Sequence, residues 1–146
     1  MGPARELADA IGTAIPGWVE RCVDQRYRAS LGAPPREVTD AARAAGEAAR
    51  AEVAPRVRAL LDADIDAQWT TPLTLIRDAV PYPTRVLVEA GVPPVARDRF
   101  GQERFPDDAY DLTPATFSDL GPEVAEPAIA WGAAKAWVHR RRHTAS

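Results

Sequence analysis

The sequence predicts an all-α, single-domain fold: an irregular multi-helix bundle with a buried C-terminal helix and a long ordered loop near residues 97–112. Three observations predict it. The chain has 146 residues, the length of one ordinary domain. Apolar residues recur at three- and four-residue spacing, and sustained two-residue alternation of β-branched residues is absent. Proline and glycine stand where helices would begin or end.

The N-terminal part, residues 1–54, is expected to form alanine-rich helices. Its first apolar stripe consists of Leu7, Ile11, Ile15, Trp18 and Cys22. We expect a break or a sharp kink at Pro16, because proline removes a helical hydrogen bond and clashes with the preceding turn. A further helix over about 36–53 carries mostly alanine on its apolar stripe. Alanine favours a helix but buries little surface, so this helix needs close contact with another helix or a second chain.

The remaining part, residues 55–146, is expected to be an aromatic core region, since most aromatic residues of the chain lie there. Pro55 is expected to separate the alanine-rich helix from a helix over 56–69, and short helices start after Thr71 and near Tyr82. The connection over 97–112 is long, but it contains Phe100, Phe105 and Tyr110. Such aromatic anchors predict an ordered loop that lies on the core.

The last helix begins at Pro122 or Pro127 and ends near Arg142, and it is apolar around almost its whole circumference. Lys135 is the main polar exception. A helix with this pattern is typically buried. We therefore expect residues 57–140 to wrap around the segment near Trp131, with the N-terminal helices packed outside it or extended toward a partner.

Composition limits the classes of function. The formal net charge is −3 and the pI is about 5.4, so no general basic field attracts nucleic acid, and a nucleic-acid partner is not expected. A lone cysteine excludes an intrachain disulfide and suits a reducing compartment. The N-terminus lacks the pattern of a signal peptide, and no apolar run is long enough to span a bilayer. These features predict a cytoplasmic protein without a membrane partner.

Two acidic groups are candidate cation sites. The run from Asp62 to Asp66 begins like a calcium loop, but alanine and leucine occupy the required glycine and glutamate positions, and neighbouring acids on a helix diverge. We interpret it as a solvated helix face. The second group, in the long loop, consists of Glu103, Asp107, Asp108 and Asp111. Weak Mg²⁺ or Ca²⁺ binding is one interpretation, and solubilising or capping is the preferred one.

Basic residues gather at the C-terminus. His139 and His143 have the spacing of helical metal ligands, but the intervening arginines would repel a cation. Positive side chains at this end of a helix also complement its dipole. Candidate contacts for an anion or an acidic partner are Arg140, Arg141, Arg142 and His143.

No arrangement of residues predicts catalysis. Cys22 lies on an apolar stripe with no histidine in its half of the chain, so we interpret it as a small core residue. No hydrolase elbow, phosphate-binding loop, dinucleotide fingerprint or zinc spacing is present, and no cofactor is expected. A candidate small-molecule pocket is formed by Trp69, Trp131, Lys135 and Trp137.

Three hypotheses follow, in order of preference. The first is a non-catalytic helical protein that acts through protein–protein interaction, with a protein partner or as a homo-oligomer. It depends on the absence of catalytic groups and on the weakly apolar N-terminal helices. The second is a small-molecule-binding or catalytic helical domain with the tryptophan-lined pocket. The third is weak nucleic-acid or anion binding through the C-terminal arginines.

Overall fold

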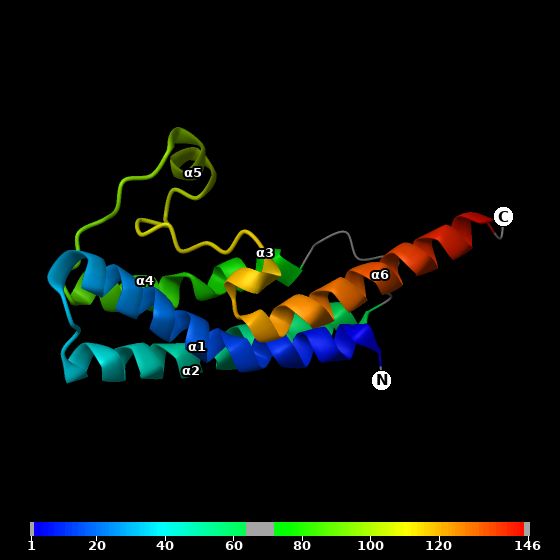
Figure 1. The fold of residues 1–146 in the computed structure, drawn as a ribbon, viewed down its shortest axis with the longest axis horizontal. Coiled ribbons are helices and arrows are strands. Elements are labelled where there is room, and N and C mark those ends of the chain that lie inside the picture. The colour runs from blue at the N-terminus through cyan, green and yellow to red at the C-terminus, as the bar shows by residue number, and fades with distance from the viewer. Residues whose placement is uncertain (1, 64–71, 145–146) are drawn as a thin grey trace.

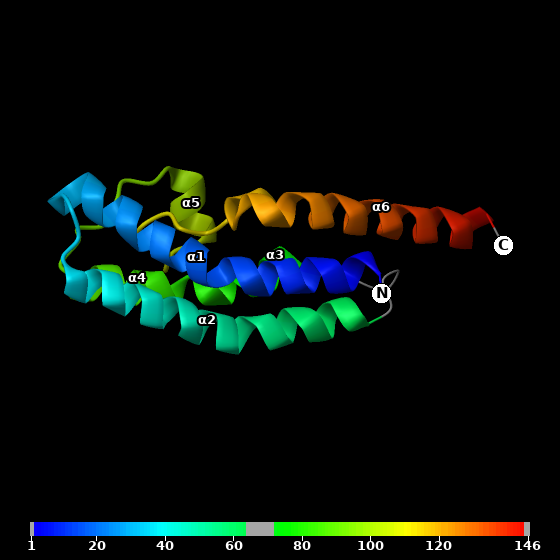
Figure 2. The same ribbon diagram turned by 60° about the horizontal axis from the view of Figure 1, so that its bottom comes forward.

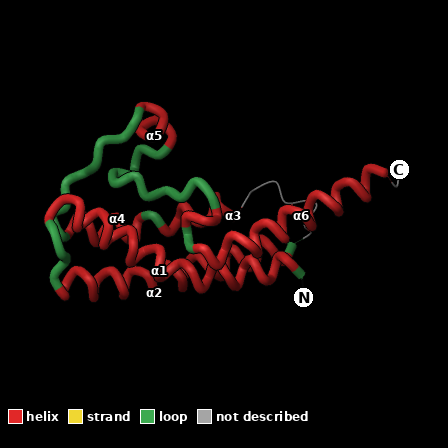
Figure 3. The backbone as a smooth tube through the Cα atoms, viewed as in Figure 1, coloured by secondary structure: helices red, strands yellow, loops and turns green. Residues whose placement is uncertain are grey.

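The computed structural model describes residues 2–63 and 72–144, without the side chains of 142–144. The described residues contain helices and no strand, which confirms the all-α fold class (Figures 1 and 3). The α-helices are α1 (Pro3–Leu31), α2 (Arg36–Asp62), α3 (Pro72–Ile76), α4 (Pro81–Glu89), α5 (Arg99–Arg104) and α6 (Pro122–Thr144). The described part of the chain also contains two 3-10 turns, η2 (Arg77–Ala79) and η3 (Phe117–Asp119).

Helix α1 is the centre of the bundle. It runs antiparallel to α2 along most of its length, and it also contacts α4 and α6 (Figures 1 and 2). The largest fully buried side chains of α1 are Leu7, Ile11, Ile15, Val19 and Val23. The expectation that residues 57–140 enclose the Trp131 segment is therefore wrong. Each of these large aliphatic side chains buries more surface than the alanines around it, and together they place the core on the N-terminal helix.

Small residues on α2 let it approach α1 closely. Ala42, Gly46 and Ala49 are buried on the α1 side, and Val53 and Val57 are fully buried beyond them. A Cβ atom added at Gly46 would lie only 2.9 Å from the Cα atom of α1 residue 16. The alanine-rich stripe thus finds the close helical neighbour that the sequence predicts it needs, within the same chain.

Neither Pro16 nor Pro55 ends a helix. Pro16 lies inside α1 and Pro55 lies inside α2, so the predicted separation at Pro55 is wrong and the chain is not broken at Pro16. A break or a sharp kink was expected at Pro16; the helix is continuous, and α1 changes direction partway along its length (Figures 1 and 2). An internal proline costs about 3 kcal/mol. Burial of several apolar side chains on each side of each proline offsets that cost.

The segment over 97–112 is anchored at one end, as predicted, but it is not a loop throughout, because Arg99–Arg104 form α5. Tyr110 is fully buried, and its hydroxyl donates a hydrogen bond to the carbonyl oxygen of Val92 at 2.6 Å. The buried carboxylate of Asp108 accepts hydrogen bonds from the backbone N–H groups of Leu112 and Thr113, where the loop ends. Phe100 on α5 does not act as an anchor, because 64% of it is exposed and α5 stands away from the bundle (Figure 1).

The prediction of a buried C-terminal helix is wrong for most of α6. Trp131 is buried, but Ile129 is 73% exposed and Trp137 is 54% exposed. The N-terminal part of α6 packs on α1, whereas its C-terminal part projects beyond the start of α1 (Figures 1 and 2). Within the described ranges, no helix combines the length and the apolar content that crossing a membrane requires.

Candidate interaction surface on helix α6

Local sequence explains why α6 forms where it does. Pro122 occupies the first position, where a missing backbone N–H costs nothing, and Glu123 places a negative charge in the first turn. Alanine is frequent through the middle of the helix, and basic residues follow from position 139 onward. The second proline, Pro127, still falls near the N-terminal end of the helix.

The inner face of α6 packs on the bundle. Val124 and Trp131 are buried, and Ala134, Lys135 and Val138 continue this face as half-buried residues. The ring of Trp131 meets the ring of Phe117 edge to face, with 6.3 Å between the centroids. The ammonium nitrogen of Lys135 lies 4.6 Å from the centroid of the same indole, which is a cation–π contact.

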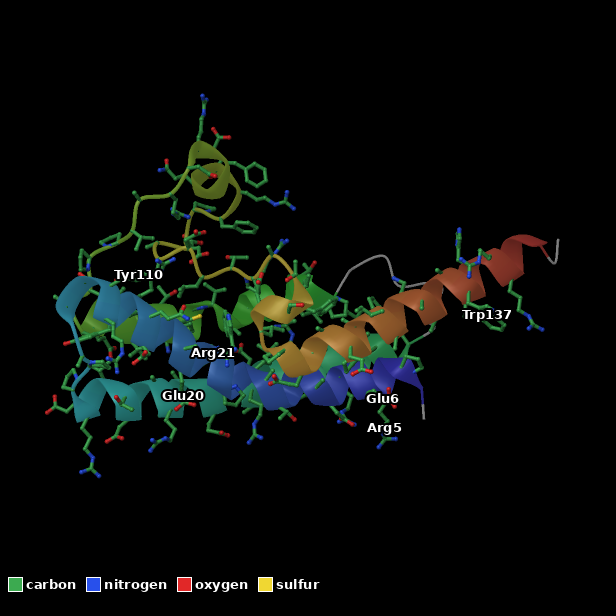
Figure 4. All side chains as sticks on the ribbon, in the orientation of Figure 1. Arg5, Glu6, Glu20, Arg21, Tyr110 and Trp137 are labelled. Carbon is green, nitrogen blue, oxygen red and sulfur yellow. The ribbon has the colours of Figure 1, made fainter. Side chains whose placement is uncertain are left out.

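A second apolar stripe lies on the other side of the helix. We call this stripe the outer face; its residues are Ile129, Gly132, Ala133, Ala136 and Trp137. Their spacing of i, i+3, i+4, i+7 and i+8 places them on one side of an α-helix, and all five are exposed. Figure 4 shows Trp137 on the projecting part of α6. An exposed apolar stripe of this length is a mark of an interaction site.

Opposite charges stand at the two ends of the outer face. Glu126 precedes Ile129 by three residues, and Arg140 follows Trp137 by three residues, so both lie on the same side of the helix. Both side chains are exposed. The guanidinium carbon of Arg141 lies 5.1 Å from the ring centroid of Trp137 and covers part of that indole.

The structure separates the members of the predicted tryptophan pocket. Trp131 and Trp137 are six residues apart on one helix, so they point in directions about 120° apart. Lys135 contacts the indole of Trp131. Trp69 lies outside the described residues. Of the predicted basic cluster, Arg140 and Arg141 are exposed on the projecting end of α6, and the side chains of Arg142 and His143 are not described.

The acidic residues of the long loop do not converge. Glu103 pairs with Arg99 at 2.9 Å. Asp108 accepts hydrogen bonds from the backbone N–H groups of Leu112 and Thr113 at 2.8 and 2.7 Å, so it caps the loop. No group of three or more potential metal ligands occurs among residues 2–63 and 72–144. In the run that begins at Asp62, positions 64–66 lie outside the described residues.

Arg140 to His143 were predicted from the sequence as contact residues and Trp137 as a pocket residue, but the other residues of the outer face were missed. Ile129, Gly132, Ala133 and Ala136 were assigned to a buried helix. A signal was present, because apolar residues covered the whole circumference of the helix. That pattern fits two opposite apolar faces as well as complete enclosure.

Comparison with known protein families, with curated proteins and with solved structures gives no match for this chain.

Proposed function

We propose that the protein is a non-catalytic helical protein that associates with a second copy of itself through the outer face of α6. The observation that carries this proposal is the exposure of Ile129 and Trp137 on one side of the same helix. A cytoplasmic location, where the single thiol of Cys22 stays reduced, is part of the proposal.

The outer face is self-complementary when two copies meet antiparallel. A two-fold axis passing at Ala133 pairs Ile129 with Trp137 of the partner subunit, because each lies four residues from the axis. The large side chains then meet in two Ile129–Trp137 pairs, one on each side of the axis, and the small residues lie between these pairs. Gly132, Ala133 and Ala136 leave room for the two backbones to approach closely, as helix packing on small residues requires.

The charges follow the same symmetry. Glu126 and Arg140 each lie seven residues from Ala133, which is about two helical turns. Antiparallel pairing therefore places Glu126 opposite Arg140 of the partner subunit at both ends of the contact. Parallel pairing would instead oppose like charges at each end. Charge complementarity of this kind selects orientation more than it adds affinity.

The size of the surface sets the expected strength of the dimer. Stable interfaces bury roughly 1,200–2,000 Å² in total, and a single pair of short helices lies at or below the low end of that range. We therefore expect a weak dimer with a Kd on the order of micromolar. Such a dimer exchanges with its monomer in solution, so its population depends on protein concentration.

Sedimentation velocity of the full chain over a range of concentrations tests this proposal. The wild-type protein is expected to shift from monomer toward dimer as concentration rises. Trp137→Ala is expected to weaken the dimer by about tenfold or more, because aromatic anchors dominate small interfaces. Ile129→Glu is expected to abolish the shift, since it places a charge in the apolar stripe.

Leu31→Ser is the matched control. Leu31 is also a large exposed apolar residue, at 50%, but it is the last residue of α1, and that end of α1 lies away from the projecting part of α6 (Figure 1). Its substitution is expected to leave the dimer unchanged. A wild-type chain that stays monomeric to about millimolar concentration would sink the proposal, as would an equal effect of the Leu31 and Trp137 variants.

A further inference from the structure

A cleft away from α6 gathers arginine side chains. It has a volume of about 610 Å³ and lies between α4, η2 and the end of α5 with the loop that follows it. Arg77, Arg85 and Arg104 line it from these three different elements, and Val80, Val88 and Phe105 supply apolar surface. Pockets for small molecules have volumes in this range and combine apolar walls with a few polar groups.

Two of these arginines contact one ring. The guanidinium carbon of Arg77 lies 4.8 Å from the centroid of Phe105, and that of Arg104 lies 5.6 Å from the same centroid. Among the described residues, neither guanidinium forms an ion pair with a carboxylate. The Nε atom of Arg77 is buried and has no acceptor there. Two like charges at one ring, without a counter-ion, favour binding of an anion.

The acidic residues on the cleft wall do not act as counter-ions for Arg77 and Arg104. The two carboxylate oxygens of Asp108 already accept hydrogen bonds from Leu112 N, Thr113 N and Thr113 Oγ1 at 2.7–2.8 Å. Glu89 and Asp107 also line the cleft, but neither lies within ion-pair distance of the arginines. Each guanidinium therefore keeps donors that an oxyanion can accept from.

We propose that this cleft binds a small organic anion, with its carboxylate or phosphate group on Arg77 and Arg104. The planar guanidinium presents paired N–H donors that match the oxygens of both head groups. A flat apolar body on the same ligand packs against Phe105 and Val88. This site is separate from the outer face of α6 and does not depend on self-association.

Isothermal titration of the full chain with three probes tests the site: phenyl phosphate, benzoate and inorganic phosphate. Phenyl phosphate or benzoate is expected to bind, and the tighter of the two identifies the head group. Inorganic phosphate is expected to bind more weakly, because it lacks the apolar body. Arg104→Gln and Arg77→Gln are each expected to reduce the affinity by about tenfold, the effect of losing one charge-assisted hydrogen bond.

Arg99→Gln is the matched control on the same short helix as Arg104. The Arg99 side chain is 91% exposed, pairs with Glu103 and does not line the cleft. The Arg99→Gln protein is therefore expected to bind the probes with the affinity of the wild type. Arg104 is exposed, so its substitution keeps the test informative even where Arg77→Gln fails to fold. Absence of binding by both organic probes at about 10 mM, or unchanged affinity in Arg104→Gln, would overturn the proposal.

Discussion

Cys22 lies on the buried stripe of α1, and with Trp18 it lines a cavity whose wall includes residues 111–114 of the loop after α5. Burial raises the pKa of its thiol to about 12, and the nearby positive charges of Arg21 and Arg26 oppose this rise without overcoming it. The thiolate is the nucleophilic form of cysteine, and it is scarce at neutral pH when the pKa is that high. The sequence interpretation of Cys22 as a core residue is confirmed by its burial.

Modification by a thiol reagent at pH 8 is expected to be at least about a hundredfold slower for the folded protein than for the protein in urea. The reason is that a pKa near 12 lowers the thiolate fraction at this pH about tenfold for each unit above the ordinary value of 9.0. With an aromatic disulfide as the reagent, the absorbance of the aromatic thiol that it releases measures the rate of modification. Rapid modification of the folded chain would contradict both the burial and the pKa of Cys22.

Other single residues have roles that the sequence alone does not reveal. Tyr110 was predicted as an aromatic anchor of the loop, and it is the most deeply buried aromatic residue there. Burial also raises the pKa of its hydroxyl. Asp108 was grouped with neighbouring acids as a candidate cation ligand, yet it is a buried cap. Adjacent residues in a loop point to different surroundings, and spacing in the sequence does not distinguish them.

At the scale of the helices, the close approach of α1 and α2 depends on Gly46. A methyl group at this position would meet the backbone of Pro16, with 2.9 Å to Cα and 3.0 Å to the carbonyl oxygen. Backbone cannot move aside as a flexible side chain can. Gly12 lies on the same pair of helices, but a Cβ atom there would lie 3.5 Å from the Cβ of Ala54, an ordinary contact.

Gly46→Ala is expected to lower the free energy of unfolding by about 1–2 kcal/mol. The steric cost of overpacking, about 1–3 kcal/mol, exceeds the gain of up to about 1 kcal/mol from the helix propensity of alanine. Gly12→Ala is the control and is expected to raise the free energy of unfolding by up to about 1 kcal/mol. Urea denaturation at one fixed protein concentration measures both. Equal changes in the two variants would argue against the close contact.

The sequence predicted the helices better than it predicted their continuity. Pro16 and Pro55 were expected to interrupt helices, because the local rule considers the lost hydrogen bond alone. The apolar side chains that hold each helix together on both sides of its proline act through tertiary contacts with the neighbouring helix. In α6 the circumference of apolar residues was visible in the sequence. The sequence did not show which sides of α6 pack against other helices, because that depends on the arrangement of the whole bundle.

At the scale of the whole molecule, the core draws on both parts of the chain. The sequence placed it among the aromatic residues beyond position 55. In the structure, Leu7, Ile11 and Ile15 are fully buried on α1, the helix that contacts α2, α4 and α6. The residues of the arginine-lined cleft are also far apart in the sequence, at 77, 85 and 104. Only the folded chain brings them together, so no spacing rule could have named that site.

The orientation of the proposed dimer can be tested with cysteine pairs on the outer face of α6. A disulfide needs Cα atoms closer than about 7 Å. Ala133→Cys places two thiols at the two-fold axis of an antiparallel pair, so mild oxidation is expected to give a covalent dimer. Ala136→Cys lies on the same face but three residues from the axis. In an antiparallel pair its two copies are offset by about 9 Å along the helices, and no covalent dimer is expected.

Non-reducing gel electrophoresis reads out both variants, and the buried native thiol of Cys22 gives no background in the wild-type chain. Parallel pairing would place each introduced cysteine beside its own copy, so both variants would then form covalent dimers. That result would leave self-association in place but refute the antiparallel register. Failure of Ala133→Cys and Ala136→Cys together, at concentrations where the wild-type chain sediments as a dimer, would place the contact away from the outer face.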